Sequence, residues 1–99
     1  MNGLKAARGE VGVVLAGVER RLCLTLGALA EIETGLGVQG LAELVARMRI
    51  LSAADLTVVL AALLRGGGEG DLARALAEAQ VDPREAAAAV AKAFAASAA

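Results

Sequence analysis

The run from Leu22 to Glu33 constrains the fold more than any other part of the chain. Its apolar residues first alternate, with the period of two of a strand, and then recur about every three and a half residues, as in a helix. A strand therefore passes directly into a helix at this point. A hairpin pattern precedes the junction and only helical patterns follow it. The sequence predicts an α+β fold, mostly α, in which an N-terminal β-hairpin precedes four to five short helices.

Two alternating runs on either side of Ala16-Gly17 predict the hairpin. If these two residues form the loop, one face of the hairpin is mostly apolar. Two strands alone are only marginally stable in water, so we expect this face to pack against helices or a partner's sheet. The predicted pairs are Leu15 with Val18, Val13 with Arg20, and Val11 with Leu22.

Two helices are expected next. Thr25 can cap the first one, and Gly35 and Gly37 end it. Its predicted inward stripe consists of Leu29, Ile32 and Leu36. The second helix, about 40–49, is amphipathic and is expected to bury Leu41, Leu44, Val45 and Met48.

A third helix is predicted from Ser52, which forms a capping box with Asp55, to Gly66. It is apolar nearly all round. Such a helix is either central in its own fold or buried by another subunit, and the second alternative predicts a homo-oligomer. The expected core stripe is Leu56, Val59, Leu60, Leu63 and Leu64, with Val58, Ala61 and Ala62 opposite it.

The glycine run 66–70 is interpreted as a flexible hinge. After it, Asp82 and Pro83 start a helix in which only Val90 and Phe94 are large apolar residues. High helix propensity with a narrow docking face indicates a loosely held arm that responds to a partner. The predicted organisation is a disordered lead at 1–7, a hairpin with a three-helix core at 8–66, and an alanine-rich arm at 67–99.

Composition excludes several classes of partner. Ten basic and eleven acidic residues nearly cancel, and the single aromatic residue offers no platform for bases, so nucleic acid is not expected as a ligand. The longest apolar stretch, Leu56 to Leu64, is half of what a membrane span needs. No apolar segment follows Lys5 and Arg8, as a secretory signal requires. One cysteine excludes an intrachain disulfide, and we expect a cytoplasmic protein.

Nothing in the sequence predicts catalysis, a metal site or a cofactor. Histidine, the commonest general base and metal ligand, is absent, and Cys23 has no base near it in sequence. Glu31 and Glu33 point in opposite directions on a helix, so they cannot share a reacting atom. The glycine spacings at 35–40 and 66–68 follow helices rather than strands, which argues against phosphate and dinucleotide loops. We therefore expect no enzyme.

The ordered combination of these segments resembles one family. It comprises Arg8-Gly9-Glu10-Val11, the junction from Leu22 to Glu33, Leu41-Ala42-Glu43-Leu44 and Leu63-Leu64-Arg65-Gly66. These segments are similar to the tail assembly chaperones of gene transfer agents, the phage-like particles of alphaproteobacteria, whose relatives are also described as tail tube proteins. The resemblance covers about Arg8 to Gly68. Many relatives carry an aromatic residue near the junction, where this chain has Arg20, Arg21 and Leu26.

The resemblance implies a helper that binds the tape measure protein in the producer cell while the tail tube assembles around it, with the tail tube protein as a second partner. The alternative is a structural component that stays in the particle tail. A helical interaction domain unrelated to tails is a third hypothesis. Apolar helix faces and an exposed hairpin edge would make the contacts. The predicted partner-binding residues are Val58, Ala61, Ala62, Arg65, Val90 and Phe94.

Overall fold

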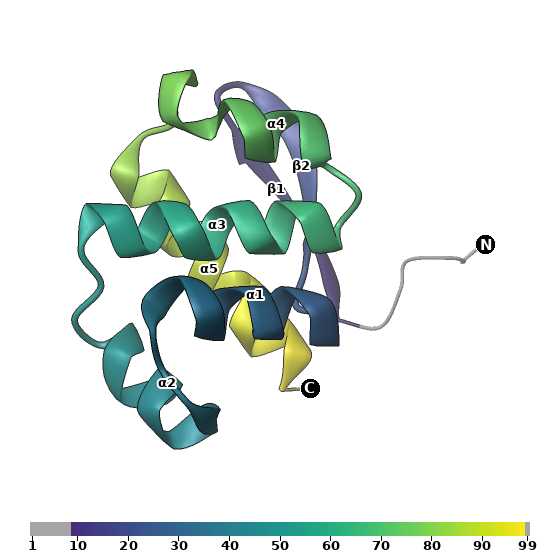
Figure 1. Cartoon of the computed structure of the whole chain (residues 1–99). Coiled ribbons are helices and arrows are strands. Elements are labelled where there is room, and N and C mark those ends of the chain that lie inside the picture. The colour runs from purple at the N-terminus through teal and green to yellow at the C-terminus, as the bar shows by residue number, and fades with distance from the viewer. Residues whose placement is uncertain (1–8, 99) are drawn as a thin grey trace.

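An N-terminal hairpin and a set of short helices make up the computed structural model, which describes residues 9–98 (Figure 1). The α+β, mostly α class predicted from the sequence is confirmed. The predicted lead at 1–7 lies outside the described residues. The elements are β1 (Glu10–Leu15), β2 (Val18–Cys23), α1 (Leu26–Leu36), α2 (Gly40–Met48), α3 (Ala53–Gly66), α4 (Gly70–Ala75), the 3-10 helix η1 (Leu76–Glu78) and α5 (Pro83–Ser97).

The hairpin has the predicted register. Leu15 pairs with Val18, Val13 with Arg20 and Val11 with Leu22. Ala16 and Gly17 both have positive φ angles, 53° and 82°, as a two-residue type I′ turn requires. Leu15 and Leu22 are fully buried, so the apolar face of the hairpin packs on the helices of the same chain.

Helix α3 is the centre of the core. Its residues from Val59 to Leu64 are all buried, and it contacts α1, β2, α4 and α5 (Figure 1). Of the two alternatives for an all-apolar helix, a central position in its own fold is therefore the one observed. The expected outer position of Ala61 and Ala62 is wrong, because these side chains are only 8% and 1% exposed.

Helix α2 packs differently from the prediction. Leu44 is buried and Met48 is half-buried, but Leu41 and Val45 are 63% and 57% exposed. The helix lies at the edge of the molecule below α1, so it has no second layer to cover both flanks of its stripe (Figure 1). Periodicity identified the apolar face correctly but overstated how much of it is buried.

Arg47 links α2 to α1 and α3 through hydrogen bonds. Its Nε and Nη2 atoms each donate to a different oxygen of Asp55 at 3.0 Å, and its Nη1 donates to the carbonyl of Leu36 at 3.0 Å. The guanidinium thus joins α2 to the start of α3 and the end of α1. A planar fork matched to a carboxylate is the geometry in which an arginine pair is most specific.

The glycine run after α3 is a packing site. A Cβ atom on Gly66 would lie 2.1 Å from the carbonyl oxygen of Cys23, and one on Gly67 would lie 2.1 Å from that of Arg21. Only glycine allows the end of α3 to lie this close to the backbone of β2. These two glycines therefore allow the end of α3 to pack directly against β2. The sequence had suggested a flexible hinge at this position.

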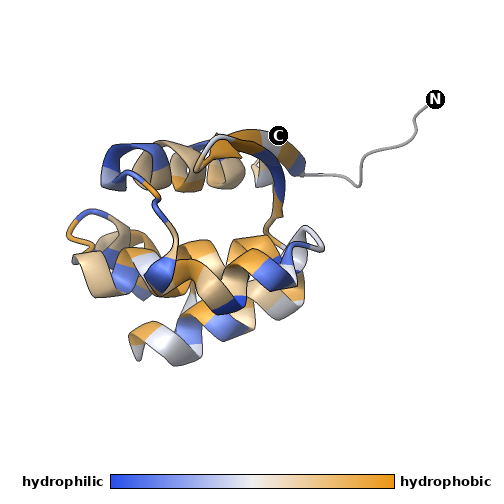
Figure 2. Ribbon diagram, turned by 90° about the horizontal axis from the view of Figure 1, so that it is seen from above, coloured by the Kyte–Doolittle hydropathy of each residue, from blue (hydrophilic) through white to orange (hydrophobic). Residues whose placement is uncertain are grey.

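Helix α5 packs against the hairpin and lies behind α3 (Figures 1 and 2). Ala86, Ala89, Val90 and Ala93 are buried in the core, and Phe94 is half-buried. The segment that the sequence predicted as an arm is therefore docked on the rest of the chain. How readily it opens stays a prediction.

Candidate functional site

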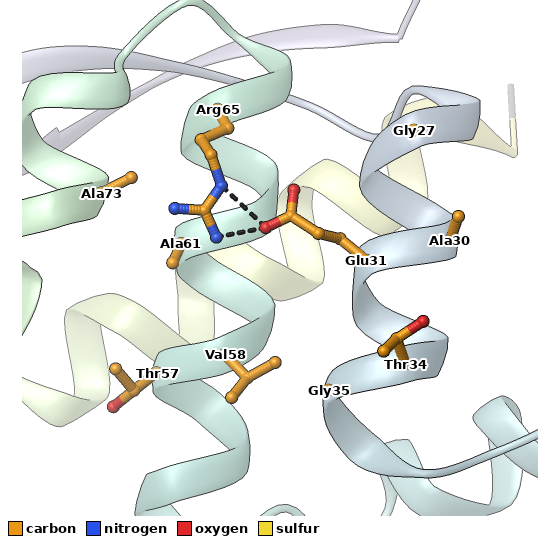
Figure 3. Close-up of a pocket in the computed structure, with 10 residues that line it drawn as sticks. All are labelled: Gly27, Ala30, Glu31, Thr34, Gly35, Thr57, Val58, Ala61, Arg65 and Ala73. Carbon is orange, nitrogen blue, oxygen red and sulfur yellow. Dashed lines mark hydrogen bonds and ion pairs between the residues drawn. The ribbon is translucent and has the colours of Figure 1, made fainter.

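A shallow groove between α1 and α3 has a volume of about 690 Å³ (Figure 3). Its lining is mostly small or apolar. Small side chains leave room for an incoming side chain to reach the helix backbones. The lining residues are Gly27, Ala30, Glu31, Thr34, Gly35, Thr57, Val58, Ala61, Arg65 and Ala73.

Two capped helices form the walls of the groove. The Thr25 hydroxyl accepts a hydrogen bond from the Ala28 amide at 3.0 Å, which fixes the start of α1. Ser52 and Asp55 form the predicted capping box at the start of α3. The two helices are in close contact where Gly35 faces Val58, because a Cβ on Gly35 would lie 2.5 Å from the Val58 Cγ1.

An ion pair spans the groove between its two walls. The Nε of Arg65 donates to Oε2 of Glu31 at 2.7 Å, and Nη2 of Arg65 donates to the same oxygen (Figure 3). The two side chains are 44% and 41% exposed. A pair this exposed contributes little to stability, about 0–1 kcal/mol. Its charged groups are accessible to a ligand in the groove.

Three of the six predicted partner-binding residues lie together in this groove, namely Val58, Ala61 and Arg65. Two others, Ala62 and Val90, are 1% and 2% exposed, so neither is accessible to a partner in this fold. Each is buried because its helix has neighbours on that side. Phe94 is half-buried on α5 and does not line the groove.

The α1 wall of the groove was not predicted from the sequence. Gly27, Ala30, Glu31, Thr34 and Gly35 recur at the spacing of a single helix face. All of them except Glu31 are small. That spacing is present in the sequence, but Gly35 was interpreted only as a helix end.

A second apolar surface is formed by Leu41, Val45 and Ile50, which we name the α2 patch. Their side chains are 63%, 57% and 74% exposed. Leu26, at the start of α1, is 84% exposed. Single exposed apolar residues are common, but three on one short helix and the turn after it indicate a contact surface.

The hairpin edges are less open than the sequence suggested. On the outer edge of β2, the Arg21 amide donates to Oε2 of Glu69 at 3.0 Å, and Arg20 pairs with Oε1 at 3.1 Å. On β1, Lys92 of α5 donates to the Gly12 carbonyl at 3.0 Å. Side-chain contacts of this kind oppose the addition of another strand where they occur. Each edge is therefore covered at one position, and the expectation that a hairpin edge contacts a partner stays a prediction.

The titratable groups with shifted pKa values serve structural contacts. Hydrogen bonds from Arg47 lower the pKa of Asp55, and the Arg21 amide lowers the pKa of Glu69. Burial raises the pKa of the Cys23 thiol, and the nearby Glu10 charge adds to the rise. Between residues 9 and 98, no three potential metal ligands of the His, Cys, Asp or Glu type cluster together.

Within the described part of the chain, no helix has the length and hydropathy to span a membrane. The model of one protein family, described as "Phage tail tube protein, GTA-gp10", matches residues 8–98. The match includes the hairpin, the groove and the C-terminal helix. No curated protein and no solved structure matches the chain.

Proposed function

Because this chain belongs to the GTA-gp10 family of phage tail tube proteins, we propose that it is a tail assembly chaperone of a gene transfer agent. In this role it binds the tape measure protein in the cytoplasm of the producer cell and assists assembly of the tail tube. The proposed activity is binding rather than catalysis. The tail-related role follows from the family, and the choice of client is our proposal.

The groove between α1 and α3 is the observation that carries the proposal. It lies between two helices and is lined mainly by small side chains. An amphipathic helix docks in such a groove by placing its apolar face against the walls. Long helical clients have to be shielded until their final partner covers them, and a groove of this shape supplies that cover.

The α2 patch supports the same role. Leu41, Val45 and Ile50 form an apolar surface on a chain of only 99 residues. Exposed apolar surface costs solubility unless a partner covers it for part of the time. We propose that the patch is a further contact surface for the client.

Among the predicted binding residues, Val58 and Arg65 would contact the client directly, because they line the groove and are not buried. Ala61 also lines the groove, but it is only 8% exposed and would form part of its floor. Ala62 and Val90 would support the fold from beneath, because they are buried. Phe94 is accessible only in part, on α5. This division assigns binding to the groove and stability to the core.

Co-expression with the tape measure protein of the same gene transfer agent tests the proposal. We expect a stable complex on affinity purification and a larger soluble fraction of the tape measure protein. The matched control is co-expression with a variant of this chain whose groove is filled by Ala30→Arg. If the wild-type chain forms no complex and gives no gain in solubility, the chaperone function is wrong.

A structural component of the tail is the second candidate, and the description of the family as tail tube protein favours it. Quantitative mass spectrometry of purified particles separates the two candidates. A chaperone is absent or present in traces, whereas a tube subunit is present in many copies per particle. Many copies would overturn the chaperone proposal and establish the structural one.

A further inference from the structure

The guanidinium of Arg65 uses only part of its hydrogen-bonding capacity. Its Nε and Nη2 atoms both donate to the single oxygen Oε2 of Glu31. Its Nη1 atom has no acceptor in the described part of the chain. In Figure 3 this atom points away from Glu31, toward the side of the groove on which Ala73 lies. An arginine has five N–H donors, so several stay open toward the groove.

The surroundings of these donors are apolar. Glu31 and Arg65 are the two charged residues in the lining, and Ala61 and Ala73 beside the guanidinium offer no side-chain acceptor. A ligand that covers the groove removes water from the open donors. It therefore has to supply an acceptor of its own or leave them unsatisfied, which is costly for a charged group.

A helix fits this groove better than an extended segment. In a helix the backbone groups bond to one another, so apolar walls can cover it without loss. An extended segment would leave many of its N–H and C=O groups against Ala30, Val58 and Ala61, whose side chains cannot pair with them. The side chain that reaches Arg65 must then project from an otherwise apolar helix face.

We propose that the segment received by the groove is an amphipathic helix whose apolar face carries one acidic side chain, and that its carboxylate shares Arg65 with Glu31. This inference rests on the proposed function, because it specifies the chemistry of the client segment. Arg65 is then the polar anchor of the groove, and Glu31 holds the guanidinium in place and competes with the client for it.

Substitution of Glu31, which competes with the client for Arg65, should change the affinity for the client in a defined direction. Glu31→Gln leaves the shape of the groove almost unchanged but takes away the charge that pairs with Arg65. We expect the affinity for the tape measure protein to rise by about twofold to fivefold, the range of an exposed ion pair. Arg65→Gln should lower the affinity by a similar factor, and should reduce its dependence on salt concentration.

A charge exchange supplies the matched control. The double variant Glu31→Arg with Arg65→Glu keeps an ion pair across the groove, and its fold can be checked by circular dichroism. It should lose affinity for the wild-type tape measure segment. It should regain affinity for the same segment with its acidic residue replaced by lysine. Binding is measured by titration calorimetry with helical peptides that tile the tape measure protein.

The outcomes separate this inference from the function on which it rests. If wild-type protein binds tape measure peptides and all charge variants bind them equally well, the groove recognises apolar shape alone and the acidic anchor is wrong. Tighter binding by Arg65→Gln would indicate a basic client and would also overturn it. If the wild-type chain binds no peptide, or binds only a second copy of itself in sedimentation, the proposed function fails too.

Discussion

At the scale of single residues, Gly66 and Gly67 hold the fold together by lacking side chains. Both lie where the end of α3 meets the backbone of β2, and a Cβ on either would lie 2.1 Å from a strand carbonyl oxygen. The backbone of Gly67, with φ of −91° and ψ of 4°, is one that alanine can adopt. A loss of stability on substitution of Gly67 therefore measures the close contact with the strand backbone and not a strained backbone conformation of the new residue.

Gly67→Ala should lower the free energy of unfolding by about 2 kcal/mol or more, because the strand backbone cannot move aside as a flexible side chain would. Gly27→Ala is the control, since a Cβ there meets only the Thr25 hydroxyl at 3.9 Å. Gly27→Ala should raise stability by about 0.5 kcal/mol through the lower entropy of the unfolded chain. Urea titration followed by circular dichroism measures both changes. Equal effects of the two substitutions would contradict the contact.

Stability should fall in acid because Asp55 and Glu69 have lowered pKa values in the folded chain. Their contribution is complete above the pKa of an unfolded carboxyl, about 4, and is lost as the pH falls through the lower folded values. Melting temperatures between about pH 6 and pH 2 should therefore decline less in Asp55→Asn and Glu69→Gln than in the wild type. A wild-type decline that both variants share in full would show that other carboxyls cause it.

At the scale of elements, α2 depends on one buried side chain. Leu44 is 2% exposed, whereas its neighbour Leu41, one turn away on the same apolar side, is 63% exposed. Leu44→Ala should cost about 2–5 kcal/mol of unfolding free energy, the range for a buried leucine. Leu41→Ala should change it by less than about 0.5 kcal/mol. If thermal or urea unfolding gave an equally large loss of unfolding free energy for both substitutions, Leu41 would be as buried as Leu44, which would contradict the structure.

Helix α5 should open before α3. Its core contacts come mainly from the small side chains Ala86, Ala89 and Ala93, so little apolar area opposes its release. Hydrogen exchange with mass spectrometry should show deuterium entering peptides from 84–97 well before peptides from 59–65. Simultaneous exchange of both segments would mean that the chain opens only as one cooperative unit.

Local sequence signals predicted where the helices and strands begin and end better than they predicted which neighbours cover them. The caps at Thr25, Ser52 and Asp82 and the turn at Ala16-Gly17 depend on residues adjacent in sequence, and all four were readable. Periodicity shows which face of a helix is apolar, but it does not show which neighbour covers that face. For this reason α2 was predicted too buried and the outer side of α3 too exposed.

At the scale of the whole molecule, a small chain combines a closed core with open apolar surfaces. α3 is surrounded within its own fold, while the groove and the α2 patch stay uncovered. The partner-binding residues predicted from the sequence stay a prediction, and three of them, Val58, Ala61 and Arg65, lie together in the groove. The α1 wall required knowledge of how α1 and α3 cross, which depends on the contact of Gly35 with Val58 and is not encoded in either helix alone.

The affinity of the tape measure protein for a chain with a filled groove tests the central claim most directly. Ala30→Arg places a long side chain at an exposed position in the groove, and Ala95→Arg makes the same change at an exposed position of α5 outside it. Both variants should fold like the wild type by circular dichroism. Ala30→Arg should lower the affinity at least about tenfold, or about 1.4 kcal/mol, and Ala95→Arg should leave it unchanged. Equal affinities of Ala30→Arg and wild type would show that the client binds elsewhere.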